Sequence, residues 1–410
     1  MKRFIVPFLY LLLSSLYISA QSASPVKDSN PDSVFLSLAP TPPMGWNSWN
    51  IFGCNINEKI IMEIADAMVS SGMKEAGYQY IVLDDCWQVG RDDNNNIVVD
   101  SVNFPKGIKF LADYIHSKGL KIGIYSCAGS LTCQRRPGSR GHQFQDAQQY
   151  AKWGIDYLKY DWCYNEEQNA KAAYKTMSDA LKACGRPIVF SICEWGENEP
   201  WKWAKGIGHL WRITPDIRDC YNCKFDWGGV GVLNIIDVMA DLHEYAGPGH
   251  WNDAEMLEVG NGGMTKDEYI THFSMWCMLA APLMAGNDLR NMSDETVEIL
   301  TNKEVIRVNQ DKLGKQAIRF MDMGKQEIWA KPLENGEIAL CFLNRNDSEW
   351  DLDYNWTKNT MYFAREIDLR KKEYSVRDLW AHKNIGTTQT NLKYKIPKHG
   401  VLMVRLSPIN

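Results

Sequence analysis

Residues 156–185, "DYLKYDWCYNEEQNAKAAYKTMSDALKACG", contain the signals of a buried strand followed by a helix. The apolar and aromatic run at 156–161 predicts the strand, and residues 167–185 predict a helix that ends at a glycine. The same order recurs along the chain. It indicates parallel strands that are joined by helical crossovers.

Eight such units follow one another, and they predict an α/β fold, a closed (β/α)8 TIM barrel. An open doubly wound sheet is the alternative, but such sheets often carry a glycine-rich phosphate turn, which this sequence lacks. The predicted pairs of strand and helix are 44–50 with 57–77, 78–85 with 104–120, 121–127 with 146–154, 156–161 with 167–185, 187–195 with 199–208, 209–216 with 230–247, 250–257 with 267–281, and 282–289 with 293–310.

The pattern changes after about Leu313, where short runs of alternating polarity are separated by Gly, Asn and Lys turns. Such runs are typical of antiparallel strands. We therefore expect a catalytic barrel at 39–313 and a C-terminal antiparallel β-sandwich domain at 314–410. The sandwich is expected to brace the barrel, and separate binding of carbohydrate is the alternative.

The beginning of the chain has the features of a targeting segment. Lys2 and Arg3 precede an apolar run and small residues around Ala20, which predicts a signal peptide at 1–20 and a leader at 21–38. We expect export to the periplasm or the extracellular space, with no membrane span. In an exported chain the eleven cysteines are candidates for disulfides, and their odd number leaves at least one free.

Composition excludes several classes of function. A net charge of −5 without a basic stripe argues against a nucleic acid or an anionic membrane as partner. With eight His, no paired-His motif and a single C-x-x-C at Cys220–Cys223, no metal and no other cofactor is predicted. The sixteen Trp are either core residues or platforms on which sugars stack. The oligomeric state stays open, a homo-oligomer included.

Polar residues stand at the carboxyl ends of the predicted strands, where TIM barrels carry their reactive groups. One acid at a strand end is more often a helix cap than a catalyst, but acids at most of eight ends exceed what a scaffold requires. Carboxylates with tryptophans and no metal suit glycoside hydrolysis. The residues at these ends are Trp46, Asp84, Asp85, Cys127, Lys159, Asp161, Glu194, Trp195, Arg212, Asp216, Asp253, Glu255, Asn287 and Asp288.

Two of these acids suit the two roles of a glycosidase. Lys159 and Asp161 share a face of their strand, so the cation is expected to keep Asp161 ionised, as a nucleophile requires. Asp216 lies beyond its strand, where it can meet a leaving group, and the charge of Asp161 is expected to raise its pKa, as a general acid requires. A retaining hydrolase places the two carboxyl groups about 5–5.5 Å apart.

Several blocks of sequence occur in the order of a known family. They include "MGWNSWN", "YIVLDDCW", "WGIDYLKYDWC", "CEWG", "WRITPDI" and "HWNDAEMLEVGNGGMT", and the match spans residues 39–310. In these blocks the chain resembles glycoside hydrolase family 27, the alpha-galactosidases. The resemblance implies a retaining double displacement that releases terminal non-reducing alpha-galactose from oligo- or polysaccharides.

The resemblance also implies roles for single residues. Asp161 corresponds to the nucleophile and Asp216 to the acid/base of the family, while Asp84 and Asp85 correspond to residues that bind the 6- and 4-hydroxyls of galactose. The other implied substrate-binding residues are Trp46, Cys133, Lys159, Cys193, Glu194, Trp195, Arg212, Glu255 and Met256. The implied disulfides are Cys54–Cys86 and Cys133–Cys163, and pairing of Cys220 with Cys223 is a conjecture.

The block "WNDAEML" departs from the "WNDPDML" that is usual in the family. Glu255 replaces an Asp that borders the pocket, and Ala254 replaces a Pro. We expect the longer carboxylate to reshape the sugar side or the leaving-group side of the site.

Three alternatives to an alpha-galactosidase stay open. A beta-L-arabinopyranosidase binds the same hydroxyl pattern without the 6-carbon, and Asp84 argues for galactose. An alpha-N-acetylgalactosaminidase needs small residues near the 2-position, whereas Glu194 and Trp195 are large. A non-catalytic galactose-binding protein is expected to have lost one of the essential acids, and both Asp161 and Asp216 are present.

Overall fold

The computed structural model describes residues 1, 34–35, 37–358, 360–362 and 366–409. The predicted signal peptide, Met1 aside, and the leader as far as residue 33 lie outside them. Within the described part of the chain, no helix has the length and apolar character needed to cross a membrane.

Eight parallel strands form one curled sheet in the order β10-β1-β2-β5-β6-β7-β8-β9. The two outer strands meet through Leu257, just after β9, whose N–H donates to the Met284 carbonyl at 2.7 Å, so the sheet closes into the predicted barrel. The strands are β1 (Met44–Asn47), β2 (Tyr80–Val82), β5 (Lys121–Cys127), β6 (Tyr157–Asp161), β7 (Val189–Cys193), β8 (Leu210–Arg212), β9 (Trp251–Asp253) and β10 (Leu283–Ala285).

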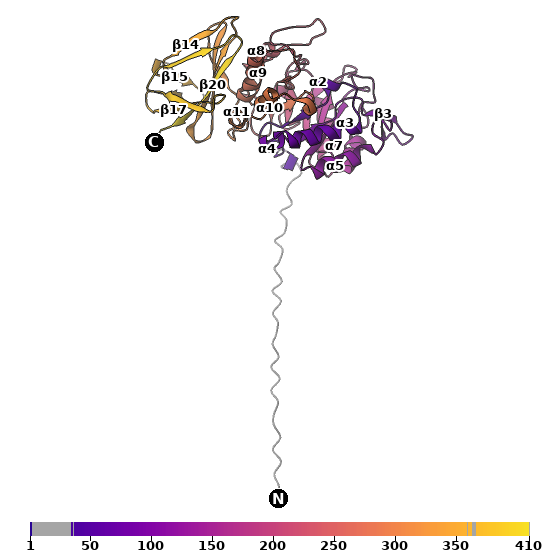
Figure 1. Ribbon diagram of the computed structural model, residues 1–410. Coiled ribbons are helices and arrows are strands. Elements are labelled where there is room, and N and C mark those ends of the chain that lie inside the picture. Colours follow the sequence, from indigo (N-terminus) through magenta and orange to yellow (C-terminus); the bar gives the residue numbers. More distant parts are fainter. Residues whose placement is uncertain (2–33, 36, 359, 363–365, 410) are drawn as a thin grey trace.

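Helices surround this barrel in Figure 1. Asn169 caps α7 by accepting the N–H of Ala172, and the helix buries Tyr174 and Leu181. The helices are α2 (Trp49–Phe52), α3 (Glu58–Ser70), α4 (Met73–Ala76), α5 (Gly107–Ser117), α6 (Gln143–Trp153), α7 (Ala170–Ala183), α8 (Val232–Met239), α9 (Lys266–Met278), α10 (Asp294–Leu300) and α11 (Lys303–Asn309), with 3-10 turns η1 (Pro200–Lys202) and η2 (Leu289–Asn291).

Two local features differ from the sequence prediction. The helix expected at 199–208 is only the single turn η1, because Pro200 opens it but Gly206, with φ of 82°, soon turns the chain away. A hairpin of β3 (Gln88–Arg91) and β4 (Ile97–Val99), which the pattern of strand and helix did not predict, occupies the loop after β2.

The C-terminal part is an antiparallel sandwich. Its main sheet has the order β11-β12-β13-β20-β17-β18, and Phe342 on this sheet packs with Trp350 and Tyr354 of the smaller β14–β19 pair. The strands are β11 (Ile318–Asp322), β12 (Gln326–Pro332), β13 (Ile338–Asn344), β14 (Trp350–Tyr354), β15 (Thr360–Tyr362), β16 (Glu366–Asp368), β17 (Tyr374–Asp378), β18 (Lys383–Thr387), β19 (Leu392–Ile396) and β20 (Val401–Pro408), with 3-10 turns η3 (Glu334–Gly336) and η4 (Trp356–Lys358). The domain boundary after residue 313 stays a prediction, and it falls between α11 and β11.

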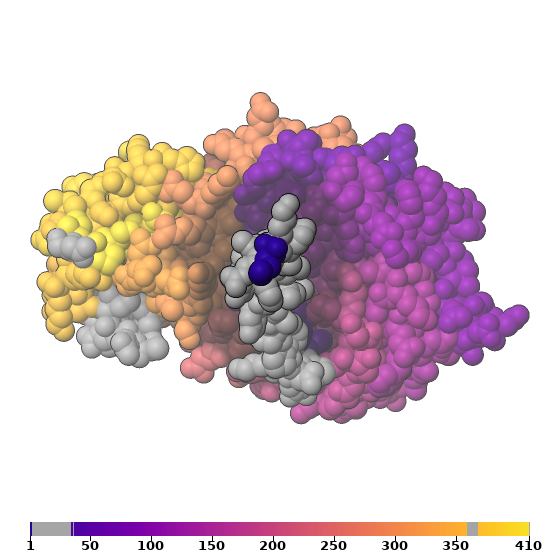
Figure 2. Space-filling view, turned by 90° about the horizontal axis from the view of Figure 1, so that it is seen from below, coloured from indigo at the N-terminus to yellow at the C-terminus, as the bar shows by residue number. Residues whose placement is uncertain are grey.

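The barrel and the sandwich lie side by side (Figure 2), with α9 between them (Figure 1). The buried ammonium of Lys331 on β12 donates to the Cys277 carbonyl at 3.1 Å, and the Trp380 indole donates to Ser274 Oγ at 2.9 Å. Trp380 also packs its ring against Phe273 of α9, so the contact of the sandwich with this helix is both polar and apolar.

Candidate active site

The strand β6 carries Asp161 as its last residue, at the carboxyl end of the barrel. Leu158 and Tyr160 face the surrounding helices and are fully buried, while Lys159 and Asp161 alternate with them and face inward. The alternation anchors the strand and directs the charged side chains into the mouth of the barrel.

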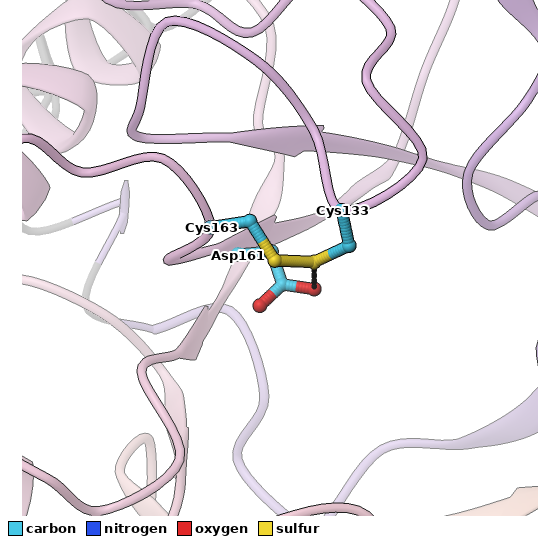
Figure 3. Close-up of side chains that lie close together, drawn as sticks. All are labelled: Cys133, Asp161 and Cys163. Carbon is cyan, nitrogen blue, oxygen red and sulfur yellow. Dashed lines mark hydrogen bonds between the residues drawn. A yellow bond between two sulfur atoms is a disulfide. The ribbon is translucent and has the colours of Figure 1, made fainter.

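The carboxylate of Asp161 is buried and held on both oxygens. Its Oδ1 accepts the N–H of Trp162 at 2.9 Å, and its Oδ2 accepts the hydroxyl of Tyr125 at 2.9 Å. The Sγ atom of Cys133 lies 3.5 Å from Oδ2 (Figure 3). Because Cys133 and Cys163 are joined in a disulfide, they provide no thiolate, and this group does not suit a metal ion.

Asp216 lies in the loop between β8 and α8, and its side chain is 46% exposed. Its Oδ1 accepts from Nη2 of Arg212 at 3.1 Å, and its carbonyl accepts the N–H of Val230 at 3.0 Å. The loop therefore presents Asp216 at the rim, in reach of solvent and of a leaving group, while Asp161 lies deeper.

Lys159 does not have the partner that the sequence suggested. Its ammonium binds Asp84 at 2.8 Å, and Asp84 Oδ2 also accepts from Asn47 at 2.8 Å. Burial raises the pKa of Asp161 to about 6, and the charge of Lys159 reverses only part of this shift. Lys159 therefore lowers the pKa of Asp161 in the expected direction, but burial outweighs it, and the ammonium forms its ion pair with Asp84.

The pKa of Asp216 is shifted in the direction opposite to the one expected. Burial raises its pKa, but the positive charges of Arg212 and Lys159 outweigh this, so its pKa lies below the usual range. The negative charge of Asp216 in turn raises the pKa of Asp161. In this arrangement Asp161 is the member of the pair that holds a proton more readily.

Arg212 is the central cation of this region and is 2% exposed. Its Nη1 donates to Glu255 Oε1 at 2.8 Å, while Nη2 donates to Asp216 and to the Thr214 carbonyl at 3.0 Å. Glu255 is buried, has a left-handed backbone with φ of 79°, and its Oε2 has no hydrogen-bond partner among the described residues. The residue that departs from the family pattern is thus bound directly to the cation that holds Asp216.

Asp84 and Asp85 follow β2 and are both buried. Asp85 accepts the N–H groups of Cys86 at 2.7 Å and Gln134 at 2.9 Å, and burial raises its pKa. Asp84 is oriented by the ion pair with Lys159. Both carboxylates are therefore fixed before any sugar binds.

The three predicted residues at the end of β7 differ in their surroundings. Cys193 is a buried thiol whose Sγ lies 3.6 Å from Arg212 Nη1, at the site. Glu194 is fully buried and its Oε2 accepts from the N–H and the amide of Asn198, while burial raises its pKa to about 7. Trp195 is half-buried with a left-handed φ of 60°. Glu194 therefore contacts its own loop.

Trp46 and Met256 are buried at the base of the site. The Trp46 indole has no exposed surface and donates to the Asn287 carbonyl at 2.8 Å, so its visible role is to tie β1 to the loop after β10. Met256 lines a cavity together with Lys159 and Arg212. Contact of either side chain with a sugar stays a prediction.

The cavity extends from the site into the barrel. Lys159, Arg212 and Glu255 border it, and so do Tyr157 and Ser191, which stand two residues before Lys159 and Cys193 on the same strand faces. The polar lining suits the binding of hydroxyl groups.

Sequence reasoning missed Tyr125 and Asn47. Tyr125 on β5 pairs in register with Lys159 on β6. It lies two residues before Cys127, the predicted strand end. Asn47 is the last residue of β1, directly after Trp46, and its side-chain amide donates to Asp84. A search of the inward-facing positions two residues before each strand end would have identified Tyr125.

Three disulfides stabilise loops at this end of the barrel. Cys54–Cys86 and Cys133–Cys163 are the pairs that the resemblance implied, and Cys220–Cys223 is the conjectured local pair. Five cysteines are free, and Cys193 is one of them. The second disulfide contacts the candidate nucleophile directly.

Known proteins match the chain over most of its length. A family model described as Alpha galactosidase A matches residues 41–311, and one described as Alpha galactosidase C-terminal beta sandwich domain matches residues 323–406. The alpha-galactosidase A of Cellvibrio japonicus is 54% identical over 97% of this chain and 97% of its own length. An alpha-galactosidase of Cyamopsis tetragonoloba is 48% identical over 90% of this chain and 87% of its own.

A solved structure agrees with these sequence matches. Alpha-galactosidase I from Mortierella vinacea has a TM-score of 0.85 and 41% identity, and the match covers 90% of this chain and 97% of that one. The chain therefore belongs to glycoside hydrolase family 27, the alpha-galactosidases.

Proposed function

We propose that this protein is an alpha-galactosidase that releases terminal, non-reducing alpha-linked galactose with retention of configuration. Family membership and the names of relatives 45–54% identical to it support the activity. The observation that carries it in the molecule is the pair of carboxyl groups at the barrel mouth, with Asp161 buried against Tyr125 and Asp216 at the rim on Arg212.

In the first step, a carboxylate oxygen of Asp161 attacks the anomeric carbon of galactose. The bond to the leaving-group oxygen breaks, and Asp216 gives that oxygen its proton, which yields a galactosyl ester on Asp161. In the second step, Asp216 takes a proton from water, the hydroxide attacks the anomeric carbon, and the ester oxygen returns to Asp161 as a carboxylate.

The protonation states in the free protein differ from those that the first step requires. Asp161 has a raised pKa of about 6, and that of Asp216 is lowered. We infer that the pair carries one proton below about pH 6, and that binding of the sugar between the two groups moves it to Asp216. The separation of about 5–5.5 Å stays a prediction of retention.

The fixed carboxylates Asp84 and Asp85, with Lys159, suit the 6- and 4-hydroxyls and the ring hydroxyls of galactose. A beta-L-arabinopyranoside lacks the 6-hydroxyl, so it leaves Asp84 without a sugar partner. A galactoside is the better substrate for this reason. We further propose that the chain is exported, which its three disulfides support.

The test compares the wild type with Asp161→Asn on three aryl glycosides: alpha-galactoside, its N-acetyl form and beta-L-arabinopyranoside. We expect the highest kcat/KM on the alpha-galactoside, the alpha anomer as the first NMR product, and a loss of roughly 10⁴-fold or more in the variant. A 2-fluoro-galactoside should label Asp161 covalently. A wild type that cleaves none of the three, or a first product of inverted configuration, contradicts the proposal.

A further inference from the structure

The loop that carries Asp216 also carries two large aromatic side chains at the surface. Trp227 is 60% exposed and Phe225 is 45% exposed. Trp227 is the one tryptophan among the exposed large apolar side chains of the described residues, whereas many of the others belong to the core. An aromatic pair of this size is costly to leave in water unless it has a partner.

The Trp227 ring is held in a fixed orientation despite its exposure. It lies against Gly229, where a Cβ atom would approach the ring carbon Cη2 to 2.4 Å. The Arg218 guanidinium stands 5.6 Å from the ring centroid, and the Phe225 ring lies 5.9 Å away at an interplanar angle of 28°. The indole is therefore a supported platform, since contacts on several sides fix it while much of its surface stays open.

The same loop is bound closely to the backbone of Asp216. The N–H of Val230 donates to the Asp216 carbonyl at 3.0 Å, and that of Arg218 donates to the Val230 carbonyl at 2.8 Å. The charge of Arg218 also reaches the Asp216 carboxyl, whose pKa it helps to lower. Arg218 thus lies within electrostatic reach of Asp216 on one side and against the Trp227 ring on the other.

The Cys220–Cys223 disulfide shortens the free part of the loop. The N–H of Gly231 donates to the Cys223 carbonyl at 2.9 Å, and the N–H of Phe225 donates to the Gly229 carbonyl at 2.8 Å. These bonds close the residues between them into a compact turn. The platform and Asp216 are therefore parts of one braced unit.

We propose that Trp227, supported by Phe225, is the platform on which the leaving-group sugar of the substrate stacks. This inference rests on the proposed function, because a general acid at Asp216 places the glycosidic oxygen, and the sugar bonded to it, on the side of its own loop. The C–H face of a pyranose ring packs on an indole face, which favours a saccharide leaving group. The substrates are then galactosides of another sugar, such as oligosaccharides.

The experiment measures kcat/KM on two substrates with different leaving groups. Melibiose releases glucose, a pyranose that can stack, whereas alpha-galactosyl fluoride releases a fluoride ion that cannot. We expect Trp227→Ala to lower kcat/KM on melibiose roughly three- to tenfold and to leave the fluoride within twofold of the wild type. Trp227→Phe should retain most of the activity on melibiose.

Two further variants separate stacking from a general effect on the loop. Gly229→Ala adds a methyl group under the ring and should cause the same selective loss without removing the indole. Phe144→Ala removes another exposed aromatic ring, in the first turn of α6, and should change neither substrate.

The outcomes distinguish the two proposals. An equal loss on both substrates, or no loss on either, in Trp227→Ala overturns the platform while the proposed function stands. A wild type that cleaves neither melibiose nor the fluoride overturns the proposed function itself.

Discussion

Replacing Glu255 with Gln removes one negative charge from a guanidinium that two carboxylates share. Arg212 donates to Glu255 at 2.8 Å and to Asp216 at 3.1 Å, and both Arg212 and Glu255 are buried. The amide of Gln keeps an oxygen that can accept the bond to Nη1. The change therefore alters the charge around Asp216 with little change in shape.

The size of the effect follows from the geometry. Two carboxylates on one guanidinium are separated by about 6 Å, and at an effective dielectric constant of about 20 their repulsion is on the order of 3 kcal/mol. That corresponds to about two pKa units, and solvent screening at the half-exposed Asp216 reduces it to about one. Without Glu255 the charged form of Asp216 is favoured, so moving the proton from Asp161 to Asp216 costs about one more pKa unit.

The assay is the pH dependence of kcat/KM on an aryl alpha-galactoside, which reports the pKa values of the free enzyme. The wild type should lose activity above about pH 6, where the pair gives up its last proton. In Glu255→Gln this limb, which Asp161 sets, should stay near pH 6, while kcat/KM should fall about tenfold, because the proton reaches Asp216 less readily. The control is Glu258→Gln, a buried carboxylate on the same loop that bonds Asn50 and Asn261. An unchanged or higher kcat/KM in Glu255→Gln refutes the reasoning.

Two other perturbations test the site and the domain interface. Tyr125→Phe removes a hydrogen bond to Asp161 and should lower kcat roughly tenfold. It should also move the limb near pH 6 to higher pH, because the charged carboxylate is less stabilised. The control is Tyr78→Phe, since the buried hydroxyl of Tyr78 has no hydrogen-bond partner among the described residues, and equal effects of the two changes would contradict the role. Lys331 is fully buried, and burial lowers its pKa to about 8. At any pH where the group is charged in both the folded and the unfolded protein, this lowers the free energy of unfolding by about 3 kcal/mol. Since folded Lys331 binds its proton less tightly than the unfolded chain, this cost is complete below pH 8 and vanishes above about pH 10.5. Lys331→Met should therefore raise the free energy of unfolding by about 1–2 kcal/mol at pH 7, once the loss of the hydrogen bond to Cys277 is counted, and by less at pH 10. Urea unfolding at the two pH values measures this. A variant that is less stable than the wild type at pH 7 would contradict the prediction.

The architecture follows from local patterns that the sequence displays openly. Tyr157–Asp161 alternates apolar and charged side chains, and a capped helix follows it, so both the strand and its inward face were predictable. The failure at 199–208 arose because Pro200 and the glycine that follows leave room for one turn only. Strand ends identify a barrel mouth because topology brings them together whatever the loops do.

Ion pairing was less predictable, because it depends on distances across strands. The spacing of Lys159 and Asp161 placed both on one face. It gave no means to tell that Asp84, which follows a strand two places away in the sheet, lies 2.8 Å from the ammonium. Likewise Glu194 stood at a strand end and yet bonds Asn198 of its own loop. A carboxylate and a cation at one mouth can pair in several ways, and only the geometry selects one.

The choice of ion-pair partners for Lys159 and Arg212 affects the protonation of Asp161. Lys159 is paired with Asp84, and Arg212 is divided between Glu255 and Asp216, so Asp161 forms its bonds with neutral donors, the Tyr125 hydroxyl and the Trp162 N–H. A buried carboxylate held by neutral groups keeps a raised pKa. A double displacement requires one proton on the pair when the substrate arrives. Because both cations form their ion pairs with other carboxylates, Asp161 retains that proton to about pH 6, and binding of the sugar has to move it to Asp216.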